Sequence, residues 1–202
     1  MKTIVLASGN KGKLREFNHM FAELPYTILP QSEFNVGAVE ETGLTFIENA
    51  IIKARHAAEV TDLPVIADDS GIEVDALHGA PGIYSARYAG EGATDKDNLN
   101  KLLTDMNNVA TEQRSCRFQC VLVLMRHAKD PTPLIAQASW EGQLLTVPSG
   151  ENGFGYDPIF WLEEQLCTSA ELAPNVKDTL SHRGQALRQL VKLLRDSPDF
   201  LS

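Results

Sequence analysis

The sequence predicts an α/β protein with a mixed central sheet, whose long strands are flanked by helices, and two lobes with an active-site cleft between them. Apolar strand-like segments alternate with amphipathic helical segments through residue 106. Two long strand-like segments, residues 114–126 and 134–147, then follow each other closely enough to form an antiparallel pair. No linker, repeat or low-complexity tract interrupts the chain, so residues 1–202 are expected to form one domain of two packed lobes.

The elements follow from local patterns. The expected strands are residues 2–7, 26–29, 63–67, 72–77, 114–126 and 134–147. The expected helices are residues 14–24, 45–60, 94–106 and one that starts after Ser181. Thr45 with Glu48 and Thr94 with Asp97 have the spacing of capping boxes, which predicts where two of these helices begin.

Two adjacent acids, Asp68 and Asp69, follow an apolar strand. Neighbouring side chains on a strand point to opposite faces, so these carboxylates share a site only if the strand has ended. The pattern therefore predicts a turn through residues 68–71, with Asp68 in an Asx turn against the amides of Ser70 and Gly71. Asp69 is then the carboxylate available for chemistry.

The charge balance restricts the ligand. A net charge of −9 argues against a nucleic-acid polymer as partner, because such binding depends on Lys and Arg neutralising many phosphates. A single nucleotide carried with a divalent cation remains compatible with an acidic chain.

The hydropathy and the cysteines indicate a cytoplasmic protein. The longest apolar run, residues 121–125, is too short to span a bilayer, and the N-terminus lacks the apolar core of a signal peptide. The three cysteines show no metal-type pairing and are expected to be buried reduced thiols.

Residues 8–13 (SGNKGK) form a glycine-containing turn before a helix, where backbone N–H groups and two lysines favour a phosphate. The spacing is not that of a Walker A loop. A plain capped turn is the alternative. Asn10 and Lys13 are the members best placed to face a ligand.

Three further features carry polar chemistry. Residues 154–158 (FGYDP) combine a flexible backbone, an aromatic ring that can stack on a base and a carboxylate; a core-filling loop is the alternative. His182 and Arg183 offer donors at a helix start, although they could be solvated first-turn residues. Glu41 precedes a helix, where the helix dipole alone favours an acid.

In this order, the motifs resemble those of the inosine/xanthosine triphosphate pyrophosphatases. The matching segments are residues 8–13, 41–46, 48–50, 53–54, 67–71, 79–82, 85–87, 154–158 and 181–183. The resemblance spans nearly the whole chain. It implies hydrolysis of ITP, dITP or XTP to the monophosphate and pyrophosphate, a homodimer, a cleft between two α/β lobes and a divalent metal, usually Mg²⁺.

The resemblance also implies roles for individual residues. Glu41 and Asp69 would bind the metal, and Ser70 would touch the substrate. The triphosphate would be bound by Ser8, Gly9, Asn10, Lys11, Gly12 and Lys13. The base and sugar would be bound by Phe154, Gly155, Tyr156, Asp157, Lys177, His182 and Arg183, with Lys177 in the least distinctive segment.

The chemistry of pyrophosphate release suits these side chains. Water attacks the α-phosphorus while negative charge builds on the departing pyrophosphate, which the metal, Lys13 and Lys53 can neutralise. Asp69 can orient the water as catalytic base, acting through its position rather than a raised pKa. Two alternatives remain at this stage: a pyrophosphatase for modified pyrimidine nucleotides, and a nucleotide-sensing module without catalysis.

Overall fold

The computed structural model describes residues 2–201, except for the side chain of Lys11. The strands are β1 (Lys2–Leu6), β2 (Tyr26–Pro30), β3 (Val65–Val74), β4 (Ser115–Met125), β5 (Leu134–Leu144), β6 (Phe160–Leu162) and β7 (Cys167–Thr168). The α-helices are α1 (Lys11–Phe21), α2 (Phe46–Thr61), α3 (Asp95–Asp105), α4 (Pro174–Leu180) and α5 (His182–Asp196). None of the helices in this described part has the length and hydropathy that a bilayer span requires.

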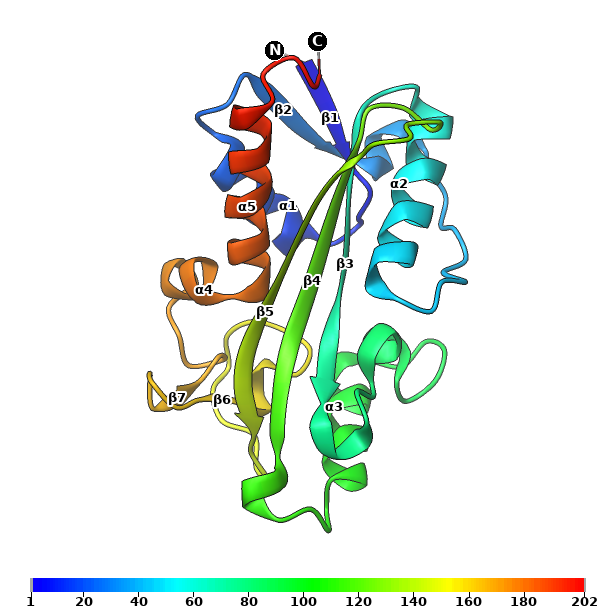
Figure 1. The fold of residues 1–202 in the computed structure, drawn as a ribbon. Coiled ribbons are helices and arrows are strands. Elements are labelled where there is room, and N and C mark those ends of the chain that lie inside the picture. Colours follow the sequence, from blue (N-terminus) through cyan, green and yellow to red (C-terminus); the bar gives the residue numbers. More distant parts are fainter. Residues whose placement is uncertain (1, 202) are drawn as a thin grey trace. The chain divides into compact units, whose positions relative to one another are not determined.

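The described strands form one sheet of seven in the order β2-β1-β3-β4-β5-β6-β7 (Figure 1). β1 is parallel to both β2 and β3, whereas β6 is antiparallel to both β5 and β7. The connection of residues 126–133 between the neighbours β4 and β5 is too short for a parallel crossover. The predicted mixed α/β sheet is therefore confirmed.

The predicted helix starts are confirmed where a local cap specifies them. Thr45 accepts a hydrogen bond from the Glu48 amide at the start of α2, and Thr94 and Asp97 form a complete capping box at α3. The start of α1 is a correction, because the helix begins at Lys11 instead of at residue 14. The reason is that Asn10 caps it, which draws three residues of the expected turn, 11–13, into the first helical turn.

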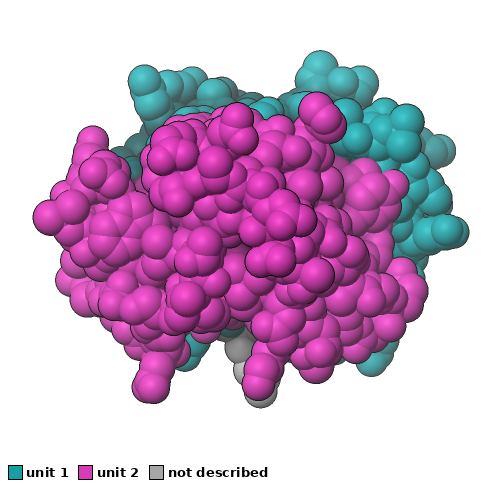
Figure 2. Space-filling view, turned by 90° about the horizontal axis from the view of Figure 1, so that it is seen from below, with its two compact units in different colours: residues 1–69, 120–138, 183–202 teal, residues 70–119, 139–182 magenta. Residues whose placement is uncertain are grey.

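The chain divides into two compact units, which Figure 2 shows in different colours. Unit 1 contains residues 1–69, 120–138 and 183–202, and unit 2 contains residues 70–119 and 139–182. The strands β3, β4 and β5 contribute residues to both units.

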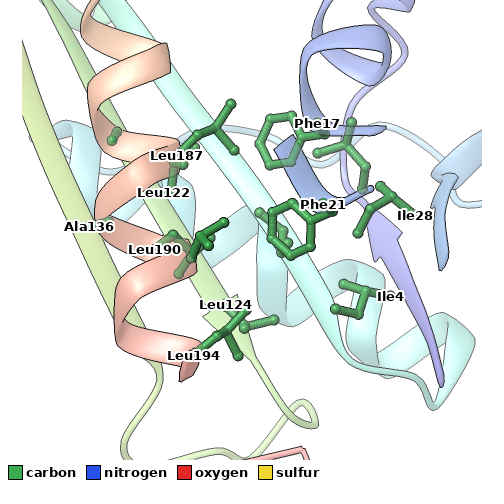
Figure 3. Close-up of a cluster of buried hydrophobic side chains, with 14 of the residues drawn as sticks. Ile4, Phe17, Phe21, Ile28, Leu122, Leu124, Ala136, Leu187, Leu190 and Leu194 are labelled. Atoms are coloured by element: carbon green, nitrogen blue, oxygen red, sulfur yellow. The ribbon is translucent and has the colours of Figure 1, made fainter. Parts of the chain in front are cut away.

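Unit 1 has helices on both faces of its strands. α1 and α5 lie on one face, where Phe17, Phe21, Leu187 and Leu190 pack in one buried cluster with strand residues such as Leu122 (Figure 3). α2 lies on the opposite face (Figure 1) and buries a stripe of small residues. That stripe consists of Ala50, Ala54, Ala57 and Ala58. Burial on both faces explains why the unit 1 part of β3 is apolar until it reaches Asp68.

Unit 2 has its own apolar cluster, in which residues of α3 pack with residues of β3, β4 and β5. Its largest members include Phe118, Trp140 and Phe160. The cysteines follow this division: Cys116 is buried in the unit 2 cluster and Cys120 in the unit 1 cluster. Cys167 is only half-buried, and all three are free thiols.

Three polar segments of unit 1 follow the last paired residues of the parallel part of the sheet formed by β1, β2 and β3. Leu6 is level with Pro30 on one side and with Ile66 on the other. The segments that follow these three residues carry Ser8, Glu41 and Asp69 in turn. Open α/β sheets bind ligands at this edge, so the topology brings the predicted phosphate and metal residues to one end of the unit 1 strands.

Candidate functional site

The strand β3 runs without interruption through Asp68 and Asp69, because it extends from Val65 to Val74. The predicted turn at residues 68–71 and the Asx turn of Asp68 are therefore wrong. The physical reason is that each carboxylate is matched by cations from a helix on its own face, so neither needs the backbone amides ahead of it. The two acids belong to different sets of contacts, as alternation along a strand requires.

Asp68 is enclosed by cations. Its carboxylate accepts hydrogen bonds from the ammonium of Lys13 on α1 and from Nε of Arg183 on α5, the latter at 2.7 Å. Cys120 Sγ lies 3.6 Å from the second carboxylate oxygen. Burial favours the neutral acid, but Arg183 and Lys13 outweigh it and hold the pKa of Asp68 well below its usual range. Asp68 is thus a buried anion at pH 7.

Asp69 has fewer partners. Its Oδ1 lies 2.6 Å from Nζ of Lys53, and the same nitrogen lies 2.9 Å from Oε1 of Glu41. Its Oδ2 is buried and has no hydrogen-bond partner among the described residues. Burial raises the pKa of Asp69 to about 6, although the Lys53 ammonium acts in the opposite direction. The predicted metal ligands Glu41 and Asp69 therefore both contact the same cation, the ammonium of Lys53.

The loop before α1 is tied into the helix start. Oδ1 of Asn10 accepts hydrogen bonds from the amides of Gly12 at 2.8 Å and Lys13 at 3.1 Å. The amide of Asn10 in turn donates to Oγ of Ser8 at 3.2 Å. Gly9 and Asn10 are exposed, and the predicted role of the Lys11 side chain lies outside the described residues. The Asn10 oxygen thus caps the helix, while Lys13 pairs with Asp68.

A cavity of about 250 Å³ in unit 1 brings several of these residues together. Pockets that enclose a whole drug-sized ligand measure about 300–1,000 Å³, so this cavity suits one part of a nucleotide. Its polar lining consists of Ser8, Lys13, Gln31, Glu41, Lys53, His56 and Asp68. Gln31 and His56 were not predicted. His56 lies three residues after Lys53 on the same helix, and that helical spacing is the signal that could have found it.

In unit 2, the segment of residues 154–157 gathers a second polar group. The Asp157 carboxylate accepts hydrogen bonds from the Lys177 ammonium, from Oγ of Ser169 at 2.6 Å and from the Phe154 amide at 2.8 Å. The Lys177 nitrogen also lies 5.2 Å from the centroid of the Phe154 ring, which is 41% exposed. At Gly153, φ is +79° and a Cβ would overlap the Asp157 carboxylate, so glycine is required there.

Two other members of this segment have structural contacts. The buried Tyr156 donates its hydroxyl to the Ser85 carbonyl at 2.7 Å, and burial raises the pKa of this phenol. The Gly155 amide donates to the Asp95 carboxylate at 2.9 Å. These contacts fix the backbone from which Phe154 projects. Ser70 is half-buried on β3, directly after Asp69.

His182 lies among aromatic rings of unit 2. Its ring stacks on Phe118, with centroids 4.8 Å apart and planes 14° apart, and Trp140 lies beyond at 6.4 Å. Phe160 contacts both Phe118 and Trp140. Only 6% of His182 is exposed, so the reading of it as a solvated first-turn residue is wrong. Arg183, the next residue, is also buried.

The predicted site residues thus fall into two groups. Unit 1 carries the charged group around Asp68, Asp69 and the loop of residues 8–13, and unit 2 carries the group around Asp157 and His182. The boundary between the units falls at two peptide bonds within the predicted site, Asp69–Ser70 and His182–Arg183. Within the described side chains, no group of three or more His, Cys, Asp or Glu residues could hold a metal ion.

The fold and these two groups define an α/β protein with an anion-handling edge on a parallel part of its sheet. The model of the Ham1 family matches residues 4–193, so this chain belongs to the Ham1 family. It is 63% identical over 196 residues to a dITP/XTP pyrophosphatase of Vibrio cholerae, covering 97% of this chain and 98% of that relative. A dITP/XTP pyrophosphatase of Shewanella oneidensis is 60% identical over 200 residues, covering 99% of this chain and 97% of the relative.

Solved structures have the same fold. A HAM1 protein from Coxiella burnetii is 50% identical, with a TM-score of 0.92, and the match covers 97% of this chain and 100% of that one. A dITP/XTP pyrophosphatase from Mycobacterium abscessus is 38% identical, with a TM-score of 0.77, covering 94% and 98% of the two chains.

Proposed function

We propose that this chain hydrolyses dITP, ITP and XTP to the nucleoside monophosphate and pyrophosphate, and so removes non-standard purines from the nucleotide pool of the cytoplasm. The observation that carries this proposal is the Asp69 carboxylate beside Lys53 and Glu41, which has one buried oxygen that no group in the described part of the chain contacts by a hydrogen bond. Membership of the Ham1 family and 63% identity to a dITP/XTP pyrophosphatase support the substrate class.

The nucleotide is held by both groups in a cleft between two lobes, with its phosphates on unit 1 and its base on unit 2. The chemistry of the side chains in each unit supports this placement. Unit 1 offers the lysines 13 and 53 and the turn of residues 8–13, which match an anion. Unit 2 offers the exposed ring of Phe154 and the stacked ring of His182, which match a flat base. The peptide bonds that join Asp69 to Ser70 and His182 to Arg183 link the two groups covalently.

Glu41 and Asp69 suit Mg²⁺ as a donor set. Both carboxylates already contact the ammonium of Lys53. Asp69 Oδ2 has no hydrogen-bond partner among the described residues, and a carboxylate oxygen is a ligand that a hard cation such as Mg²⁺ prefers. Proteins commonly hold Mg²⁺ with one or two carboxylates and complete its coordination with waters and substrate phosphates, so two acids are enough. When bound, Mg²⁺ would neutralise charge that develops on the phosphates.

The residues of the chain have separate tasks in the reaction. Asp69 orients the attacking water toward the α-phosphorus and accepts its proton. Lys53 and Lys13 neutralise the departing pyrophosphate, and the bond between the α-phosphorus and its bridging oxygen breaks as the new bond to water forms.

Base selectivity rests on unit 2. Hypoxanthine and xanthine present an oxygen at position 6 where adenine presents an amino group, so a donor aimed there is left unpaired by ATP, at a cost of about 1–3 kcal/mol. His182 is that donor, held in plane by Phe118. Arg183 is proposed to assist it, although its guanidinium binds Asp68 and Glu16 in the nucleotide-free chain and would have to exchange one of them. Phe154 stacks on the base, and Asp157 with Lys177 binds the sugar.

The test is pyrophosphate release from dITP, ITP, XTP, GTP, ATP and dUTP, with and without Mg²⁺, by the purified chain. We expect turnover of the first three to exceed that of the others by about a thousandfold or more in kcat/KM, and to require Mg²⁺. The chain is expected to act as a homodimer, which a sedimentation measurement on the same sample checks.

Three outcomes contradict the proposal. Equal turnover of GTP and dITP would overturn the assignment of the base site, and preference for dUTP would make the chain a pyrimidine nucleotide pyrophosphatase. Binding of dITP without release of pyrophosphate would leave only a nucleotide-sensing module. Release of orthophosphate in place of pyrophosphate would overturn attack at the α-phosphorus.

A further inference from the structure

The segment that carries Glu41, residues 36–45, contains no helix or strand. A loop of this length is not held in place by its own backbone hydrogen bonds, and a metal ligand on it would have to be ordered at each binding event. Glu48 caps the end of the loop through Leu44 and Thr45, and three further side-chain contacts with α2 order the rest of it in this structure. They are made by Asn49, Lys53 and His56, which lie four and three residues apart and so share one face of the helix.

Asn49 holds the end of the loop nearest α2. Its Oδ1 accepts a hydrogen bond from the Gly43 amide at 2.8 Å, and the residue is completely buried. Its Nδ2 has no hydrogen-bond partner among the described residues. An unpaired buried amide nitrogen is destabilising, so Asn is an unfavourable choice here unless its oxygen is needed. The oxygen is the atom that binds the loop.

Gly43 shows how closely the loop approaches the helix. A Cβ at this position would lie 2.7 Å from Asn49 Oδ1 and 3.0 Å from the Asn49 backbone nitrogen. It would also lie 2.5 Å from Glu48 Cβ, which cannot move without disturbing the first turn of α2. Glycine is therefore required for the hydrogen bond to Asn49, two residues from Glu41.

His56 holds the other end of the loop. Its Nε2 lies 3.2 Å from the carbonyl oxygen of Gly37, which can only accept, so the Nε2–H tautomer donates. His56 and Gly37 both line the unit 1 cavity, as Glu41 and Lys53 do. The loop is thus attached to α2 on both sides of Glu41, and the middle contact is the Glu41–Lys53 ion pair.

We propose that Asn49 and His56 are positioning residues, which fix the loop of residues 36–45 on α2 so that Glu41 meets an incoming divalent cation in a preformed position. The proposal rests on the proposed function, in which Glu41 binds that cation. Residues that orient metal ligands typically change metal affinity by about 10- to 100-fold when they are mutated. Their effect is on the affinity for the cation and much less on the rate once the cation is bound.

The experiment is a titration of the nucleotide-free protein with Mn²⁺ alone, with the unbound ion measured by electron paramagnetic resonance. We expect Asn49→Leu and His56→Leu each to raise the Kd for Mn²⁺ about tenfold. His56→Gln, which keeps a donor at similar reach, should recover most of that loss. Glu59→Gln, at an exposed position on the same helix, is the matched control and should leave the Kd unchanged. Glu41→Gln is the reference for loss of the ligand itself.

Hydrogen exchange and kinetics supply two further readouts. Amides of residues 36–45 should exchange faster in the two leucine variants and not in Glu59→Gln. With dITP, the Mg²⁺ concentration for half-maximal activity should rise about tenfold, while kcat at saturating Mg²⁺ should fall less than about threefold. If Asn49→Leu does not fold, the His56→Leu and His56→Gln pair decides.

The outcomes separate this inference from the function on which it rests. If Glu41→Gln weakens Mn²⁺ binding while the leucine variants bind it like the parent chain, the positioning role is wrong and the proposed metal site stands. If Glu41→Gln itself leaves the Kd unchanged, the metal assignment fails and the positioning role fails with it. If His56→Gln is as weak as His56→Leu, the hydrogen bond to Gly37 is not what His56 contributes.

Discussion

The two faces of β3 carry adjacent aspartates in contrasting surroundings. Asp68 meets two cations and a thiol and is almost fully buried, so its charge is matched within the chain. Asp69 shares one lysine with Glu41 and keeps one oxygen without a partner. One carboxylate thus stabilises the arrangement of α1 and α5, while its neighbour has an oxygen that can bind a ligand.

The largest effect is expected from Asp69→Asn. The amide cannot accept the proton of water and is a poor ligand for Mg²⁺, so kcat with dITP should fall about 10³- to 10⁴-fold. Stability at pH 7.5 should not decrease, since a buried carboxyl with a pKa of about 6 is costly to ionise. Pyrophosphate release and urea unfolding of the same variant measure both quantities. A large loss of stability would show that Asp69, like Asp68, is mainly structural.

Asp68→Asn should show the opposite pattern. Lys13 and Arg183 would lose their shared counter-ion inside the protein, and breaking a buried ion pair costs about 3–5 kcal/mol in free energy of unfolding. Arg183 keeps Glu16, so a value of about 3 kcal/mol is expected here. Urea denaturation at pH 7.5 measures it. A variant as stable as the parent would mean that the two cations are solvated and that the contrast between the faces is false.

The smallest effect is on the pH dependence of stability, where the two aspartates should have opposite signs. The pKa of Asp69, about 6, lies above the value of about 4 in the unfolded chain. Its contribution is therefore complete below about pH 4 and is lost as the pH rises through 6. The pKa of Asp68 is depressed, so its contribution is present above about pH 4 and is lost as the pH falls below that value.

Metal-free urea unfolding from about pH 3 to pH 8 tests this contrast in the parent chain and both variants. The stability of the parent relative to Asp69→Asn should decline between about pH 4 and pH 6, by up to about 2–3 kcal/mol, which is two pKa units at about 1.36 kcal/mol each. The stability of the parent relative to Asp68→Asn should be flat above about pH 5 and decline below pH 4. Parallel curves would mean that the two carboxyls titrate alike.

Elements with local signals were predicted well. α2 and α3 begin where the Thr45 and Thr94 caps place them, because a cap is a contact between residues three positions apart. β3 was predicted as two strands, because Asp-Asp-Ser-Gly has the composition of a turn. What keeps it extended is the set of cations on α1, α2 and α5, which are distant in sequence from these acids. The short strands β6 and β7 and the helix α4 were not predicted.

At the candidate site, too, local sequence patterns predicted the residues better than their contacts. Glu41 and Asp69 were expected to meet at one cation, and Lys53 joins both of their carboxylates. Lys13 was expected to face the ligand, yet it pairs with Asp68. The helical spacing of His56 from Lys53 places both on one face of α2, but only the fold shows that His56 contacts the loop that carries Glu41. Which side chains pair across the fold depends on distances in three dimensions, and these cannot be read from the spacing of residues along the sequence.

The sequence by itself determined the mixed α/β class, the starts of the capped helices and the residue types at the phosphate end of the site. Those features depend on periodicity and on contacts within a few residues. Only the tertiary structure decided which aspartate is neutralised and which is left with an unused oxygen. The reason is that β3 is buried between helices on both of its faces. An unmatched charge is costly in such surroundings, so each acid is stabilised by the lysine or arginine that the fold brings next to it.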